Sequence, residues 1–148
     1  MTEIIKTTEN NGVYPFAFVS ALILAPLTIA VPAYGILFAA SYAEAPIAQF
    51  IVLFFPIGAA WIGAPTYLTF GAFSFLRTLK RGGTSAGSLV LAGLRAHAVS
   101  APFVLIPLSL TEPSSDVLPT AVAFFLLGLI FAPLWSAIFA LLYERFTR

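Results

Sequence analysis

Residues 117–143 read VLPTAVAFFLLGLIFAPLWSAIFALLY and contain no charged side chain. A helix of about 20 mainly apolar residues is long enough to cross the roughly 30 Å of hydrocarbon in a bilayer. A helix of this length on the surface of a soluble protein would carry polar and charged residues along its outer face. The stretch therefore predicts a transmembrane helix, and the same test applies to the rest of the chain.

Three further stretches lack charged residues, namely residues 10–43, 45–76 and 96–111. The first two are long enough for a membrane span, whereas the third, at 16 residues, is too short. It reaches the necessary length only together with the apolar residues 86–94, which draws Arg95 into the span. We therefore expect four spans, near residues 15–41, 46–76, 87–110 and 117–143.

The composition agrees with lipid as the solvent. Of the 148 residues, 60% are hydrophobic and 9% are charged, whereas about a quarter of a soluble domain is charged. The net charge of +1 and the lack of a basic stripe argue against nucleic acid as a partner. Cysteine is absent and histidine occurs once, so one chain can form neither a thiolate metal site, nor a multi-histidine metal site, nor a haem site with two histidine ligands. We expect an all-α polytopic membrane protein without a cofactor or bound metal.

The basic residues predict the orientation of the chain, because Lys and Arg concentrate on the cytoplasmic side of membrane proteins. With four crossings every cation outside the spans falls on one side, and the two opposite loops hold only acids. The cations are Lys6, Arg77, Lys80, Arg81, Arg145 and Arg148, and the acids are Glu44, Glu112 and Asp116. We expect both termini in the cytoplasm and a location in a bacterial cytoplasmic membrane.

Spans two and four share a sequence pattern that suggests an internal duplication. Ala-Pro-Thr-Tyr at residues 64–67 corresponds to Ala-Pro-Leu-Trp at residues 132–135, and in each copy an arginine follows the proline by twelve residues. Two tandem helical hairpins, residues 13–81 and 88–148, would then form a parallel repeat about an axis along the membrane normal. The alternative is chance recurrence of Ala-Pro in a chain rich in both residues.

Prolines and small residues occur throughout the expected spans. The prolines that we expect to kink helices are Pro26, Pro65, Pro102 and Pro133. Each removes a backbone donor and frees a carbonyl one turn earlier, which creates either a polar cavity lining or simple curvature. Small residues spaced by four allow helices to approach closely, and they are Ala17, Ala21 and Ala25, then Ala92, Ala96 and Ser100, then Gly35 with Ala39 and Gly128 with Ala132.

Arg95, His97 and Ser100 are candidate functional residues because polar side chains are costly within a membrane. Arg95 and His97 are about 200° apart on a helix and therefore face opposite sides. Arg95 can reach cytoplasmic headgroups or bind an anionic lipid or substrate, and His97 can bond to a proline-freed carbonyl or handle protons. Ser100 shares the face of His97, but no carboxylate is available to orient a catalytic pair, so we expect no enzymatic activity.

Tyr67 and Trp135 occupy matched positions in the two halves, close to the expected middle of the membrane. Their polar groups need partners when buried. They are candidates for the lining of a cavity between the halves, with simple packing as the alternative.

Two classes of function fit these features. Short loops and few intramembrane charges favour an accessory or structural subunit of a larger membrane complex. The repeat, the prolines and the Arg95–His97 pair favour a small oligomeric transporter or channel for an apolar or amphipathic solute. We favour the subunit, whose partners would be membrane lipids and either other membrane proteins or further copies of the chain.

Overall fold

The computed structural model of the chain describes residues 12–111 and 114–148, and every regular element in these residues is helical. The elements are α1 (Pro15–Tyr42), the 3-10 segment η1 (Ile47–Leu53), α2 (Phe54–Thr66), the π-helical segment η2 (Tyr67–Gly71), α3 (Ala72–Lys80), α4 (Ala86–Thr111) and α5 (Ser114–Thr147). Within these residues four helical segments are long and apolar enough to cross a membrane: Pro15–Tyr42, Ala48–Lys80, Ala86–Pro107 and Val117–Thr147. The expectation of an all-helical chain with four helices long and apolar enough to span a membrane is confirmed.

Some helix ends differ from the expected span limits. α1 begins at Pro15, whose missing N–H donor is harmless in a first turn. α5 begins at Ser114 and ends at Thr147, so Pro119 lies inside the helix and not at its start. Charge-free limits mark the part of a helix that lies in hydrocarbon, whereas its hydrogen bonds continue beyond that part. Arg148, which follows the end of α5, pairs with Glu144 in the last turn of the helix. Glu112 lies outside the described residues.

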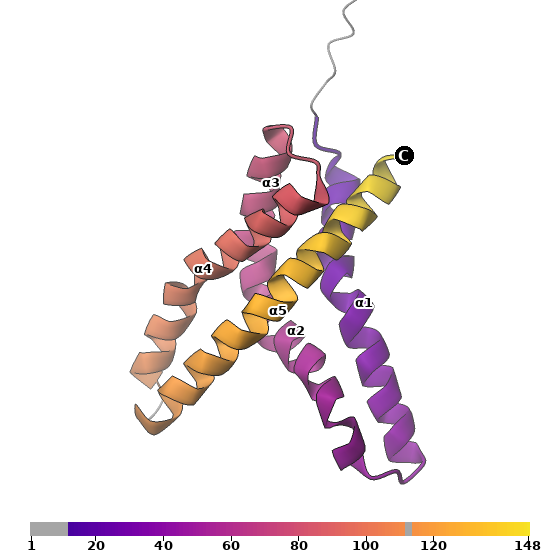
Figure 1. Cartoon of the computed structure of the whole chain (residues 1–148), viewed down its shortest axis with the longest axis vertical. Coiled ribbons are helices and arrows are strands. Elements are labelled where there is room, and N and C mark those ends of the chain that lie inside the picture. Colours follow the sequence, from indigo (N-terminus) through magenta and orange to yellow (C-terminus); the bar gives the residue numbers. More distant parts are fainter. Residues whose placement is uncertain (1–11, 112–113) are drawn as a thin grey trace, which may run out of the picture.

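The helices cross near the middle of the molecule and diverge from there (Figure 1). α5 runs diagonally, packing along α4 at one end and against α1 towards its own C-terminus. α1 also packs on α2, and α4 also packs on η2 and α3. Away from the C-terminal end, the pair α4 and α5 separates from the pair α1 and α2 (Figure 1). The lower parts of both pairs therefore expose much of their apolar surface.

An aromatic core occupies the half of the molecule near the C-terminus. Phe139 of α5 stacks on Phe75 of α3 with ring centroids 4.6 Å apart, and Phe18 of α1 meets Phe139 edge-on at 5.5 Å. Tyr143 continues the stack at 5.8 Å from Phe139. Three of the four spans thus meet at one cluster of rings, whose edge-to-face and stacked contacts each add to the packing energy.

The small residues lie on two buried helix faces. These faces consist of Ala17, Ala21 and Ala25 on α1, and of Ala92, Ala96 and Ser100 on α4. Close approach of the helices therefore takes place within one chain at these positions. Gly35 and Ala39 near the far end of α1 are exposed and do not contribute to it.

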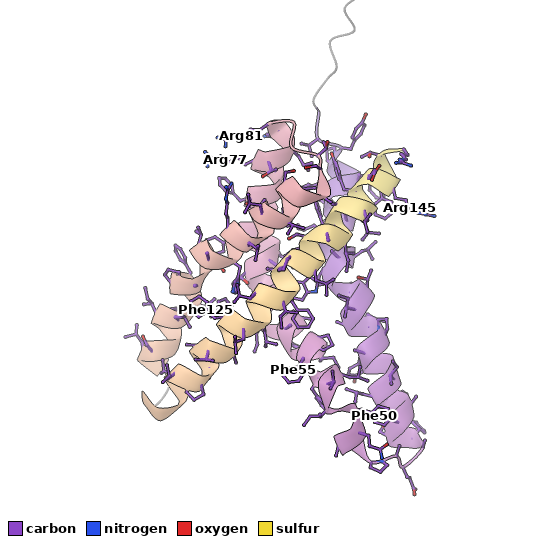
Figure 2. All side chains as sticks on the ribbon, in the orientation of Figure 1. Phe50, Phe55, Arg77, Arg81, Phe125 and Arg145 are labelled. Carbon is purple, nitrogen blue, oxygen red and sulfur yellow. The ribbon has the colours of Figure 1, made fainter. Side chains whose placement is uncertain are left out.

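The start of α1 and the end of α5 lie at the same end of the molecule (Figure 1). The backbone N–H of Tyr14 donates a hydrogen bond to the hydroxyl of Tyr143 at 3.3 Å. Arg77, Arg81 and Arg145 also lie at this end (Figure 2). The side of the membrane that this end faces stays a prediction.

Candidate functional site

A small cavity lies where the second, third and fourth spans meet. Its volume is ≈ 40 Å³, and its lining includes His97 and Ser100 of α4, Trp135 of α5, and Tyr67 at the start of η2. These four candidate residues, which come from three spans, are therefore brought together at one place. Thr66 at the end of α2 adds a further polar side chain to the lining.

The imidazole of His97 packs directly against Gly128 of α5, which has no side chain to block it. A Cβ atom built on Gly128 would lie 1.9 Å from Cε1 and 2.0 Å from Nε2 of the imidazole, so the ring occupies that space. The ring also packs against Phe124 at a centroid distance of 4.8 Å. The backbone of Phe125 is a hydrogen-bond partner for the imidazole. Nε2 is buried and has no partner in the described part of the chain.

Trp135 is 3% exposed and is surrounded by rings. Tyr67 meets it edge-on with centroids 5.4 Å apart, and Phe131 lies 5.8 Å away. Gly63 of α2 leaves room for the indole, because an added Cβ would lie 3.2 Å from Cζ3 and Cη2. The hydroxyl of Tyr67 donates to the backbone carbonyl of Trp135 at 3.4 Å. The indole Nε1, in contrast, is buried with no partner among the described residues.

Two buried serines bond to their own helices. Ser100 donates to the carbonyl of His97 at 2.8 Å, and Ser136 donates to the carbonyl of Ala132 at 2.6 Å. Ser136 also fills the space that a side chain on Gly93 of α4 would need, since an added Cβ would lie 1.9 Å from its Oγ. α4 and α5 therefore approach closely at two points, with Ser136 on Gly93 and His97 on Gly128.

Arg95 does not take part in this site. Its side chain is exposed and does not line the cavity, as the angle of about 200° from His97 requires. The ion pair found within residues 12–111 and 114–148 joins Arg148 to Glu144, so Arg95 has no carboxylate partner there. The sequence-based candidates for contact with its guanidinium, which are lipid headgroups and an anionic lipid or substrate, stay predictions.

The candidate kink prolines do not line the cavity. α1 continues through Pro26, α4 through Pro102 and α5 through Pro133. Pro65 is followed within two residues by the π-helical segment η2, so the second span is the one whose helical hydrogen-bond pattern changes. The hydroxyl of Thr69 donates to the carbonyl of Pro65 at 2.8 Å.

A second, larger groove of ≈ 690 Å³ runs between α1 and α2. Pro26 and Pro65 lie in it, together with Tyr34 and Trp61, and the rest of its lining is aliphatic. The groove is therefore suited to apolar contacts and offers polar groups only at the tips of two aromatic side chains.

The sequence alone identifies the polar residues of the cavity, but it does not identify all the glycines against which they pack. Gly63 and Gly93 lie outside the small-residue pairs, and Gly128 belongs to them only through its spacing from Ala132. Their position within the expected spans could have identified them, since glycine is the residue that lets a partner side chain approach a helix backbone most closely.

Among the described residues, no three His, Cys, Asp or Glu side chains come together as metal ligands do. No family model matches the chain, and no curated protein or solved structure is significantly similar to it.

Proposed function

We propose that the chain is a non-enzymatic integral membrane subunit that packs against other membrane proteins through its second span. The observation that carries this proposal is the sparse packing of that span. In the Ala48–Lys80 segment 11% of the most apolar stretch is buried, compared with 33% in each of the first and third spans. A span with so few contacts inside its own chain has most of its surface free for contacts with lipid or with other proteins.

Trp61 supports a protein partner for this surface. It lies near the middle of the second span and is 81% exposed. Tryptophan favours the membrane–water interface because its indole N–H needs a hydrogen-bond partner. Hydrocarbon offers no such partner at the middle of a bilayer. A neighbouring helix that covers Trp61 would supply it.

The tight centre of the molecule also favours the subunit over a solute pathway within one chain. The cavity of ≈ 40 Å³ is far smaller than most ligand pockets, which measure about 300–1,000 Å³. On its C-terminal side the Phe75–Phe139 stack fills the space between the helices. A solute would need these rings to separate.

We further propose the tandem repeat and the cytoplasmic placement of both termini. α1 packs on α2 and α5, while α4 packs on α5 and on the η2–α3 part of the second span. A two-fold axis along the membrane normal would exchange these contacts, and the matched residues Tyr67 and Trp135 touch each other. The cationic end would face the cytoplasm of a bacterial cell.

The test is the native mass of the protein extracted from its membrane. A tagged chain is purified in mild detergent, and the subunit role predicts co-purification of a reproducible set of other membrane proteins. Trp61→Ala should release them. Phe16→Ala is the matched control, because Phe16 is 83% exposed but lies on α1. A particle that contains only the 15.8 kDa chain, as a monomer, would overturn the proposal.

The groove between α1 and α2 supports a second candidate function. Its ≈ 690 Å³ falls within the size range of small-molecule sites, and its lining suits an apolar or amphipathic solute. A homo-oligomeric transporter or channel would be supported by a native particle made of this chain alone in several copies. Solute flux into liposomes that contain only this protein would then replace the subunit role with transport.

A further inference from the structure

The imidazole Nε2 of His97 and the indole Nε1 of Trp135 both belong to side chains that line the ≈ 40 Å³ cavity. They are the two buried side-chain nitrogen or oxygen atoms without a hydrogen-bond partner in the described part of the chain. Buried polar groups in proteins nearly always have partners. We infer that the cavity is a binding site for a hydroxyl group, supplied by water, which bridges His97 and Trp135.

The chemistry of the two nitrogens selects a hydroxyl group. The indole N–H of Trp135 can only donate a hydrogen bond. The backbone of Phe125 already bonds to the imidazole of His97. A peptide N–H within a helix is committed to that helix, whereas a carbonyl oxygen has a second lone pair, so the imidazole is the donor in this bond. The neutral ring then leaves Nε2 as an acceptor.

The occupant must therefore accept from Trp135 and donate to His97. A hydroxyl group can act in both ways, because its oxygen accepts a hydrogen bond and its proton donates one. A halide or a carbonyl group could satisfy only the indole, and an ammonium group could satisfy only the imidazole.

The dimensions and the remaining lining of the cavity agree with water. A water molecule needs at least about 10–15 Å³ of such volume and two to four polar partners, so ≈ 40 Å³ holds one to three molecules. Thr66 and Ser100 also line the cavity. Both hydroxyls donate to their own helices, at 2.8 Å to Gly63 and 2.8 Å to His97, and keep lone pairs for a bound water.

The inferred water site does not depend on the proposed subunit role, because it concerns contacts inside one chain. A purified monomer would overturn the subunit role and leave this site untouched.

The test uses the indole of Trp135 as a reporter. The chain has two tryptophans, so Trp61→Phe leaves Trp135 as the only one. Ultraviolet resonance Raman spectra of this variant report whether the indole N–H is hydrogen-bonded. We expect a hydrogen-bonded indole in vesicles of pure phosphatidylcholine, where water is the only source of hydroxyl groups outside the protein. A bond that appears only after a long-chain alcohol is added would overturn water as the occupant and assign the hydroxyl to a membrane alcohol.

Two further substitutions in the Trp61→Phe background separate the water bridge from a hydrogen bond that the indole makes to some other group. His97→Phe removes the nitrogen that accepts the hydrogen bond from the water. Ala59→Val fills the cavity from α2 while keeping both nitrogens. Each should convert the indole to its unbonded spectrum, and the second protects the test if the first fails to fold. An unbonded indole in every vesicle, or a bonded indole that neither substitution changes, would overturn the inference.

Discussion

The ring of Tyr67 meets the ring of Trp135 edge-on, with centroids 5.4 Å apart and an interplanar angle of 74°. Each residue lies two positions after a proline, Pro65 in the second span and Pro133 in the fourth. The hydroxyl of Tyr67 also reaches the carbonyl of Trp135 at 3.4 Å. This pair joins the π-helical segment to α5 and forms one wall of the cavity.

We predict that this junction depends on the ring of Tyr67 more than on its hydroxyl. Tyr67→Ala removes the contacts with Trp135 and Phe75. It should lower the free energy of unfolding by about 3 kcal/mol, the low end for aromatic truncations, because in the unfolded state lipid tails already offer an aromatic side chain an apolar environment. Tyr67→Phe should lower it by less than about 1 kcal/mol, since the bond is long. Unfolding of the purified protein by dodecyl sulfate in mixed micelles measures both. Tyr34→Ala, at an exposed position, is the control, and equal losses in Tyr67→Ala and Tyr34→Ala would contradict the prediction.

The closest approach of α4 and α5 yields a second prediction. A Cβ on Gly93 would lie 1.9 Å from Oγ and 3.0 Å from Cβ of Ser136, and 3.2 Å from the carbonyl oxygen of Ala132. Gly93→Ala should therefore force the helices apart and destabilise the protein by about 1–3 kcal/mol. Gly35→Ala is the matched control, because no atom other than the neighbouring backbone of its own helix lies within 4 Å of its added Cβ. There alanine should be neutral or slightly stabilising in the helix.

A double substitution shows whether contact with Ser136 causes the destabilisation expected for Gly93→Ala. Ser136→Ala removes the nearest atom, so combining it with Gly93→Ala should recover part of the lost stability, and the two changes should not be additive. The contact with Ala132 would keep the recovery incomplete. If Gly93→Ala and Gly35→Ala have the same melting temperature, the close approach of the two helices does not hold at this position.

The spans follow from the sequence because hydrocarbon excludes charged side chains, a local property that can be read along the chain. The opposite placement of Arg95 and His97 follows equally from helical geometry. The cavity is harder to foresee, because it depends on which helix lies opposite Gly63, Gly93 and Gly128. Such pairings are non-local. The π-helical segment shows the same limit, since Pro65 indicates a lost hydrogen bond but not how the helix compensates for it.

The packing of the His97 imidazole against Gly128 can be tested directly, because His97 is the only histidine in the chain. Gly128→Ala places a methyl group where the imidazole now lies and should push the ring out of the cavity. The ¹⁵N and ¹³C resonances of the imidazole, recorded in micelles, should shift. Gly87→Ala at an open position of α4 should leave them unchanged. Unchanged resonances in Gly128→Ala would place the imidazole elsewhere.

Ser74 offers a test of a polar contact between helices. Its hydroxyl donates to the carbonyl of Ala92 on α4 at 2.9 Å, whereas the hydroxyl of Ser109 bonds within its own helix to Ile106 at 2.7 Å. Ser74→Ala should therefore destabilise the protein by about 0.6 kcal/mol, and at most about 1.7 kcal/mol, as is typical of such bonds in membranes. Ser109→Ala should have almost no effect. The same dodecyl sulfate titration measures both, and a larger loss for Ser109→Ala would show that the bond to Ala92 does not join the helices.

The absence of cysteine makes the proposed orientation accessible to labelling. Ala43 follows α1, and Thr84 belongs to the loop between α3 and α4. This loop lies at the end of the molecule where Arg77 and Arg81 are found (Figure 2). Because basic loops stay in the cytoplasm, a membrane-impermeant maleimide should label Ala43→Cys in intact cells and Thr84→Cys only after permeabilisation. The reverse pattern would invert the chain in the membrane. Labelling of both positions from the outside would contradict the four-span arrangement itself. The Ala48–Lys80 segment between them could then not cross the bilayer.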